Sequence, residues 1–121
     1  MYDAINKGTS IHILSFQVRK DIRGVEEYFL KHNIEEAQIP PSMLRIFHSK
    51  SPSLRLVITA GERLVNCYND NSTIINLYGM TETSGGFLLK IVDQKYRNTP
   101  VGQPVDAVKG ELINEDGNCV R

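Results

Sequence analysis

The sequence predicts an α/β fold in which a mostly parallel sheet carries helices on its faces. Over the first ninety residues, short runs of β-branched and aromatic residues alternate with stretches of helical periodicity. This alternation is typical of parallel strands joined by helical crossovers. The chain has 121 residues, of which 40% are hydrophobic and 23% charged, so it is long enough to bury one core and has the composition of a folded domain.

The first elements follow from periodicity and end signals. Residues 11–16 predict a strand because they are β-branched and aromatic. Asp21 is a good N-cap for a helix over 22–32, whose apolar residues recur at helical spacing. Residues 37–39 predict a short extended piece held by the two prolines that follow, and a second helix is expected over 41–48.

The strongest strand signal lies in the middle of the chain, at residues 54–60. The last residues of this segment are nearly all apolar, as in strands with both sheet faces covered. Gly61 ends the strand, and we expect a short helix over 62–68. A loop then leads to another strand at 73–78.

The remaining segments predict a loop, a strand and a hairpin in turn. Residues 79–86 predict a polar, glycine-rich loop, and 87–92 a further strand. Residues 109–114, followed by an Asp-Gly pair, predict a β-hairpin. The expected C-terminal tail is therefore the beginning of an antiparallel element.

Composition excludes several classes of protein. Fourteen basic residues balance fourteen acidic ones, so the clustered basic excess of a nucleic-acid binder is missing. No apolar run is long enough to span a membrane and no signal peptide is visible, so we expect a cytoplasmic protein. Cys67 and Cys119 are predicted to be inert thiols, and His12, His32 and His48 are too scattered to predict a zinc site.

Two loops follow strands at the edge where ligands bind in parallel sheets. They are residues 60–62 and 78–86. The second loop offers three hydroxyls for oxyanions, from Thr81, Thr83 and Ser84. Glu82 stands among these hydroxyls, and one carboxylate beside phosphate-binding groups is a common way to hold Mg²⁺. Tyr78 supplies a flat ring for a base, although from chemistry alone a merely solvated polar loop is equally expected.

The usual nucleotide signatures are absent from the chain. It contains no G-x-x-x-x-G-K-[ST] and no G-x-G-x-x-G between a strand and a helix. A phospho-receiver domain requires clustered acids at the end of the first strand, where this chain has Ser15-Phe16-Gln17.

A longer pattern in the chain resembles a known family. The run Asn76-Leu77-Tyr78-Gly79-Met80-Thr81-Glu82-Thr83 resembles the N-x-Y-G-P-T-E-T core motif of the adenylate-forming (AMP-binding) enzymes. It is most similar to the amino-acid adenylation domains of nonribosomal peptide synthetases. Flanking matches occur in the family's order at residues 1–8, at 54–62 and at Pro100–Pro104 followed by Asp116-Gly117. The chain is thus identified as a fragment of such a domain.

The resemblance implies a role for each matching residue. Tyr78 stacks on adenine opposite the Ala60-Gly61-Glu62 backbone, Gly79 allows close approach, and Asn76 hydrogen-bonds the adenine amino group. Thr81 contacts the α-phosphate and Glu82 coordinates Mg²⁺, so these two are the catalytic candidates. The implied acyl side-chain pocket consists of Gln38, Ile58, Ala60, Leu77, Gly85 and Gly86. For Ile58, Ala60 and Leu77, simple core packing is an equally good interpretation.

The resemblance also implies fold, activity and partners. Residues 1–98 are expected to form a flavodoxin-like subdomain, and 99–121 the start of a β-barrel-like segment. The family uses ATP and Mg²⁺ to convert a carboxylic or amino acid into an acyl-adenylate, then transfers the acyl group to a carrier-protein thiol. The expected partners are this substrate, the rest of the adenylation domain and a phosphopantetheinyl carrier domain, with no nucleic acid and no membrane.

Two further expectations concern what the chain does alone. The family's phosphate loop would precede Met1, and its ribose-binding aspartate and catalytic lysine would follow Arg121, so the isolated chain is expected to be inactive. Met80 replaces the usual proline, which leaves an acyl- or aryl-CoA ligase as an alternative parent. From a different class, a non-catalytic α/β interaction module stays open.

Overall fold

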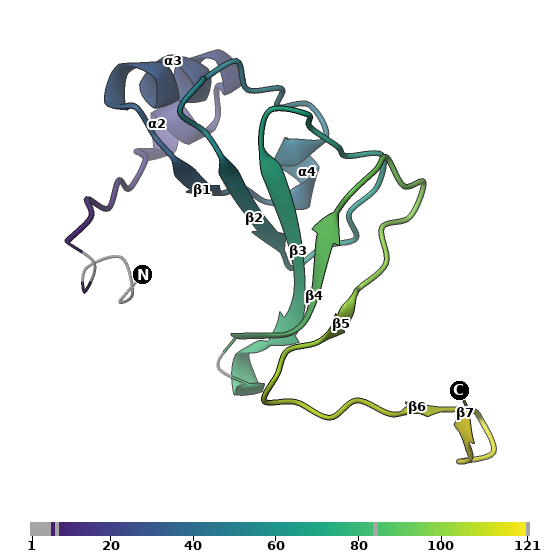
Figure 1. Cartoon of the computed structure of the whole chain (residues 1–121). Coiled ribbons are helices and arrows are strands. Elements are labelled where there is room, and N and C mark those ends of the chain that lie inside the picture. Colours follow the sequence, from purple (N-terminus) through teal and green to yellow (C-terminus); the bar gives the residue numbers. More distant parts are fainter. Residues whose placement is uncertain (1–5, 7, 84, 121) are drawn as a thin grey trace.

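The computed structural model describes residues 6, 8–83 and 85–120, and it places a five-stranded mixed sheet at the centre of the molecule (Figure 1). The strands run in the spatial order β1-β2-β3-β4-β5. Their bounds are Glu36–Gln38, Leu56–Ala60, Thr73–Met80, Gly85–Val92 and Gln103–Pro104. The first two pairings are parallel and the last two antiparallel, so the predicted parallel arrangement holds for β1 to β3.

Helices pack against one face of this sheet (Figure 1). They are α2 (Phe16–Arg19), α3 (Ile22–His32) and α4 (Pro41–Leu44). The side chain of Asp21 accepts a hydrogen bond from the Arg23 amide (3.1 Å) and caps α3 as predicted. α3 buries Val25 and Phe29 in the core, so the apolar stripe expected from the sequence is confirmed.

The core lies between these helices and one side of the strands. Its strand members are Val57, Ile74 and Val92, which are 1%, 2% and 6% exposed. Alternate residues of β2, Leu56, Ile58 and Ala60, point to the other face and are only half-buried. The expectation that both faces of this strand are covered is therefore wrong for the described part of the chain.

The predicted strand at 11–16 is not formed. Residues 11–15 have no regular structure, and Ile13 is 82% exposed. The edge strand β1 has only three residues, so it offers few ladder partners. Ser15 instead caps α2 by accepting from the Val18 amide (3.3 Å), which draws the end of the expected strand into a helix.

The predicted helix at 62–68 is also absent. Its backbone groups bond to a distant segment instead: the Asn66 amide donates to the Tyr96 carbonyl (2.8 Å), and the Leu64 carbonyl accepts from the Thr99 amide (3.0 Å). Asn66 has a φ of 53°, in the left-handed region, which interrupts helical geometry. Tertiary pairing therefore overrides the local helical pattern.

Two further boundaries differ from the sequence prediction. α4 ends at Leu44 rather than His48, although Phe47 is still buried. The expected loop at 79–86 is shorter, because β3 continues to Met80, a 3₁₀ helix η1 spans Thr81–Thr83, and β4 already begins at Gly85. The two strands pair antiparallel, with a bulge between Tyr78 and Gly79.

The C-terminal hairpin is confirmed as β6 (Leu112–Ile113) paired with β7 (Cys119–Val120), and it stands apart from the sheet (Figure 1). The two cysteines differ. Cys67 is buried, and burial raises the pKa of its thiol, whereas Cys119 is exposed, so only Cys67 fits the expected buried thiol. Within the described ranges, no helix is both long and apolar enough to cross a membrane.

Candidate functional site

The candidate site is built where β2 and β3 end side by side. The parallel register pairs Thr59 with Asn76 and Ala60 with Leu77. Gly61 therefore leaves β2 next to Tyr78, although seventeen positions separate them in the sequence. Because parallel strands end at the same edge of a sheet, the two loops identified from the sequence are brought together.

Tyr78 and Gly61 give this edge a flat ring and an accessible backbone. The Tyr78 side chain is 50% exposed, and its ring packs edge-on against Phe87 with centroids 5.5 Å apart. Gly61 has a φ of +91° with open space where a Cβ would project. A planar group stacked on Tyr78 could therefore approach this backbone closely.

Asn76 lies one pair deeper, on the core side of the sheet, and is only 6% exposed. Its Nδ2 donates a hydrogen bond to the carbonyl of Pro100 at 3.2 Å. One of the two N–H groups of the amide is therefore bonded to the protein, and Oδ1 is an acceptor.

Thr81 and Glu82 are exposed in η1, directly after β3. The side chain of Thr83 and all of Ser84, the other two hydroxyl candidates, lie outside the described part of the structure, as does most of the matching segment at 1–8. Among the residues described, no group of three or more His, Cys, Asp or Glu could hold a metal. Glu82 is an exposed carboxylate, and a single carboxylate can hold a Mg²⁺ ion that is bound mainly by phosphates and waters.

The residues implied for the acyl pocket lie on the sheet face opposite the helices. Ile58, Ala60 and Leu77 are half-buried on this face. Gln38 pairs with Ile58 in the ladder. A Cβ on Gly86 would lie 3.0 Å from the Leu77 Cβ, so Gly86 packs directly on Leu77. Gly85 pairs with Met80 one step further along.

The structure adds the burial of these implied pocket residues and the packing of the neighbouring Gly79. Ile58, Ala60 and Leu77 are only half-buried and are not members of the main core. Gly79 is required by close packing, because a Cβ there would lie 2.2 Å from the Gly85 carbonyl oxygen. Gly79 thus lets β3 and β4 approach each other beside the site.

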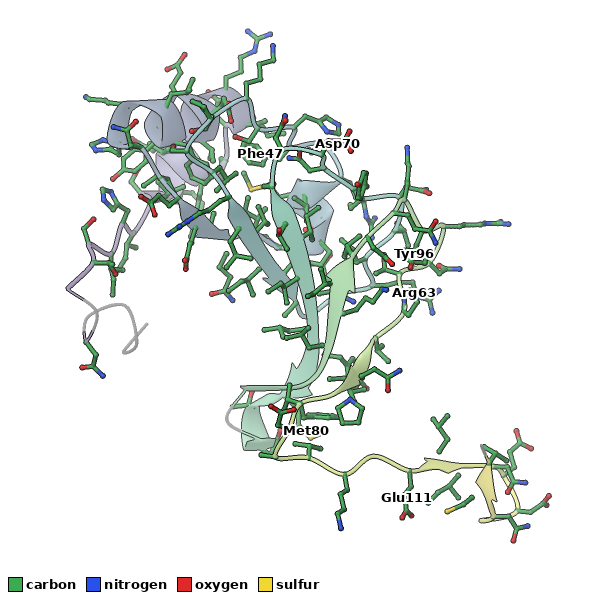
Figure 2. All side chains as sticks on the ribbon, viewed as in Figure 1. Phe47, Arg63, Asp70, Met80, Tyr96 and Glu111 are labelled. Atoms are coloured by element: carbon green, nitrogen blue, oxygen red, sulfur yellow. The ribbon has the colours of Figure 1, made fainter. Side chains whose placement is uncertain are left out.

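A charged cluster at the other end of β4 was not predicted from the sequence. Asp93 Oδ1 accepts from the Tyr96 hydroxyl (2.7 Å) and pairs with Lys90 Nζ (3.0 Å). Lys90 Nζ also lies 5.3 Å from the centre of the Tyr96 ring. Figure 2 shows Tyr96 beside the end of β4, whereas Met80 lies at the opposite end of the sheet. The available signal was Lys90 itself, a charged residue inside an apolar strand.

This cluster perturbs the acid–base properties of its members. The hydrogen bond from Tyr96 and then that from Lys90 lower the pKa of Asp93 from 3.8 to about 2. The hydrogen bond to Asp93, followed by that to Tyr96, raises the pKa of Lys90. Both shifts favour the charged pair.

Asp93 is expected to make the stability of the fold depend on acid pH. Because its folded-state pKa lies below the ordinary value of 3.8, its stabilising contribution is complete above that value and is lost as pH falls towards 2. Urea unfolding of the wild type and Asp93→Ala should therefore show a stability difference that shrinks between pH 4 and 2. A difference that stays constant across this range would contradict the assignment.

The chain is similar to known proteins in both sequence and fold. The chain matches no family profile. It is 32% identical over 124 residues to tyrocidine synthase 1 of Brevibacillus parabrevis and 30% identical over 118 residues to bacitracin synthase 1 of Bacillus licheniformis. Each match covers 96% of this chain, but only 11% of tyrocidine synthase 1 and 2% of bacitracin synthase 1. Among solved structures, PA1221, an NRPS protein containing adenylation and PCP domains, matches with a TM-score of 0.68 at 18% identity.

The chain is similar to a fragment of a nonribosomal peptide synthetase adenylation domain. The structural match covers 83% of this chain and 23% of PA1221, so this chain shares the α/β fold of that part of PA1221. The family resemblance first noted in the Asn76–Thr83 motif is thus confirmed by sequence over almost the whole chain. The chain spans only a small part of the length of these relatives.

Proposed function

We propose that this chain supplies the base-stacking and metal-binding edge of an ATP-dependent adenylation site. The supporting observation is that β2 and β3 bring Ala60-Gly61-Glu62 beside Tyr78, with Thr81 and Glu82 following at once. In the proposed reaction, a substrate carboxylate oxygen bonds to the α-phosphorus of ATP while the bond to pyrophosphate breaks. Mg²⁺, when bound, offsets the charge of the phosphates.

Each residue of the edge has one proposed task. Tyr78 stacks on adenine, and the backbone of 60–62 covers the opposite face of the base. Thr81 donates to the α-phosphate and Glu82 binds Mg²⁺. Positioning and charge stabilisation of this kind supply most of the rate in phosphoryl chemistry.

We propose an amino acid as the substrate, with its side chain against the sheet face opposite the helices. This face carries Ile58, Ala60 and Leu77, with Gln38 and Gly86 beside them. The acyl group would then pass to a carrier-protein thiol, since the relatives are synthases of peptide antibiotics by name. Residues 1–98 are proposed as the α/β subdomain and 99–121 as the start of a separate β segment, in line with the hairpin that stands apart (Figure 1).

Met80 favours a second candidate function, an acyl- or aryl-CoA ligase. Its side chain is 52% exposed at the end of β3, where peptide-synthetase domains usually have proline. Amino-acid- or fatty-acid-dependent exchange of labelled pyrophosphate into ATP by the full-length protein tests both proposals. Exchange with amino acids supports the synthetase, exchange with fatty or aryl acids supports the ligase, and no exchange with any acid leaves the non-catalytic module.

The chain alone is expected to bind Mg-ATP only weakly. A stacked base contributes about 1–3 kcal/mol, whereas a millimolar dissociation constant already requires about 4 kcal/mol. A titration followed by amide NMR should give small shifts, without saturation below millimolar ATP, confined to 60–62 and 78–86. Saturation at micromolar ATP would contradict this prediction.

A further inference from the structure

Two side chains of α4 contact the loop that follows β2. Ser42 donates from its hydroxyl to Glu62 Oε1 at 3.4 Å, and Arg45 donates from Nη2 to the Arg63 carbonyl at 3.0 Å. The second bond is the shorter and has a charged donor, so it is the stronger of the two. Both contacts reach the stretch of chain that leaves the end of β2.

This loop is fixed at its two ends and exposed between them. Ala60 pairs with Leu77 in the sheet, and Leu64 is buried in the core with 1% of its surface exposed. Residues 61–63, which lie between these points, are all exposed. Gly61 has a φ of +91°, and a glycine gives the backbone wide conformational freedom. The α4 contacts therefore support the part of the loop that the core does not hold.

α4 is a firm base for these contacts. Its Pro41 and Leu44 are buried, and their spacing of three places them on one face of the helix. Ser42 and Arg45 have the same spacing, one position further on, so they share the adjacent face, which is exposed. The Ile39 amide, just before α4, donates to a carbonyl of β2 at 3.0 Å. The helix is thus anchored to the same strand that the loop leaves.

We propose that Arg45, supported by Ser42, is a positioning residue that holds the backbone of 60–62 at the separation from Tyr78 at which a nucleotide base fits between them. Both residues act through the loop rather than on the nucleotide. The contacts stand on the structure described above, and their use on a nucleotide rests on the proposed adenylation function.

The position of the loop matters because a base stacked on Tyr78 has a second face to cover. A loop that is already in place covers this face without losing further backbone freedom. A free loop must be ordered when the base binds, and this ordering weakens binding. Loss of the Arg45 bond should therefore weaken nucleotide binding without slowing the chemical step, which raises the KM for ATP and leaves kcat nearly unchanged.

The first test measures loop motion in the 121-residue chain without any nucleotide. Arg45→Met keeps a long side chain but removes its donors and its charge. The backbone amide order parameters of 61–63, measured by NMR relaxation, should fall from about 0.85, typical of rigid backbone, to below about 0.6. Ser42→Ala should give a smaller fall because its bond is longer, and Ser42→Thr should keep the wild-type values because it retains the hydroxyl.

The second test measures nucleotide binding in the full-length protein. In Arg45→Met, pyrophosphate exchange should show a KM for ATP about fivefold to tenfold higher, with kcat within about twofold of the wild type. Arg23→Met is the matched control. Arg23 is an exposed arginine on another helix, α3, so this variant also removes one positive charge but leaves the α4 contacts intact. It should keep the wild-type KM and order parameters.

The outcomes separate this inference from the proposed function. If the order parameters of 61–63 do not change in Arg45→Met, Arg45 does not hold the loop and the inference is wrong. If the loop becomes mobile but the KM for ATP stays the same, or if Arg23→Met raises the KM equally, the positioning role is wrong. If the wild-type protein exchanges pyrophosphate with no acid, the adenylation proposal and the nucleotide role both fail, while the order parameters still decide whether Arg45 holds the loop.

Discussion

Replacing Glu82 with glutamine is expected to lower adenylation by the full-length protein about 100-fold at limiting Mg²⁺, the scale on which preorganised charge stabilisation acts. Glutamine keeps the size of the side chain but loses the negative charge that holds a divalent cation. Because Glu82 is exposed in η1, the fold should not change. The measurement is pyrophosphate exchange against Mg²⁺ concentration, with partial recovery expected when Mg²⁺ is raised.

Glu115→Gln serves as the control, because Glu115 is also exposed but lies in the turn between β6 and β7, far from η1 in the sequence. This variant should keep wild-type exchange at every Mg²⁺ concentration. Equal rates for Glu82→Gln and the wild type at limiting Mg²⁺ would show that Glu82 is not a metal ligand. A loss that high Mg²⁺ does not relieve at all would point to a role other than metal binding.

The largest loss of stability is expected for Phe29→Ala. Phe29 is 5% exposed on α3, and its ring packs edge-on against Phe47 with centroids 5.5 Å apart. Removing a buried aromatic ring costs about 3–5 kcal/mol, which is a large share of the 5–15 kcal/mol that stabilises an ordinary domain. Urea unfolding of the chain, followed by circular dichroism, should show a much lower midpoint with a similar slope.

Phe16→Ala is the matched control for this prediction. Phe16 is 57% exposed on α2, where Lys20 and Arg19 lie over its ring at 3.9 and 5.0 Å. Its removal should lower the free energy of unfolding by no more than about 1 kcal/mol. If the two variants lost similar stability, the core would not be centred on α3.

The candidate site was largely predictable because its signals are local. The motif from Asn76 to Thr83 is continuous, and its neighbour at 60–62 follows a strand whose apolar run is clear in the sequence. The parallel pairing of β2 and β3 then brings residues 60–62 beside this motif. The strand and helix alternation already implied that pairing, since crossover connections favour parallel neighbours.

The elements that the sequence predicted wrongly depend on distant partners. Residues 62–68 have a helical pattern, yet Leu64 and Asn66 bond to Thr99 and Tyr96, thirty or more positions later. Residues 11–15 have strand composition, yet the edge strand β1 has only three residues with which a further strand could pair. Local propensity is a weak preference, and long-range hydrogen bonds override it.

The sequence by itself determined the α/β class, the capped helix α3, the adjacent strands β2 and β3, and the edge that carries Tyr78 and Glu82. Each of these follows from periodicity, a cap or a continuous motif, which act over a few neighbouring residues. The tertiary structure alone decided which face of the sheet stays open and how Asn76 is turned. Both depend on contacts between residues far apart in the chain, such as Pro100 and Asn76, whose meeting no local pattern specifies.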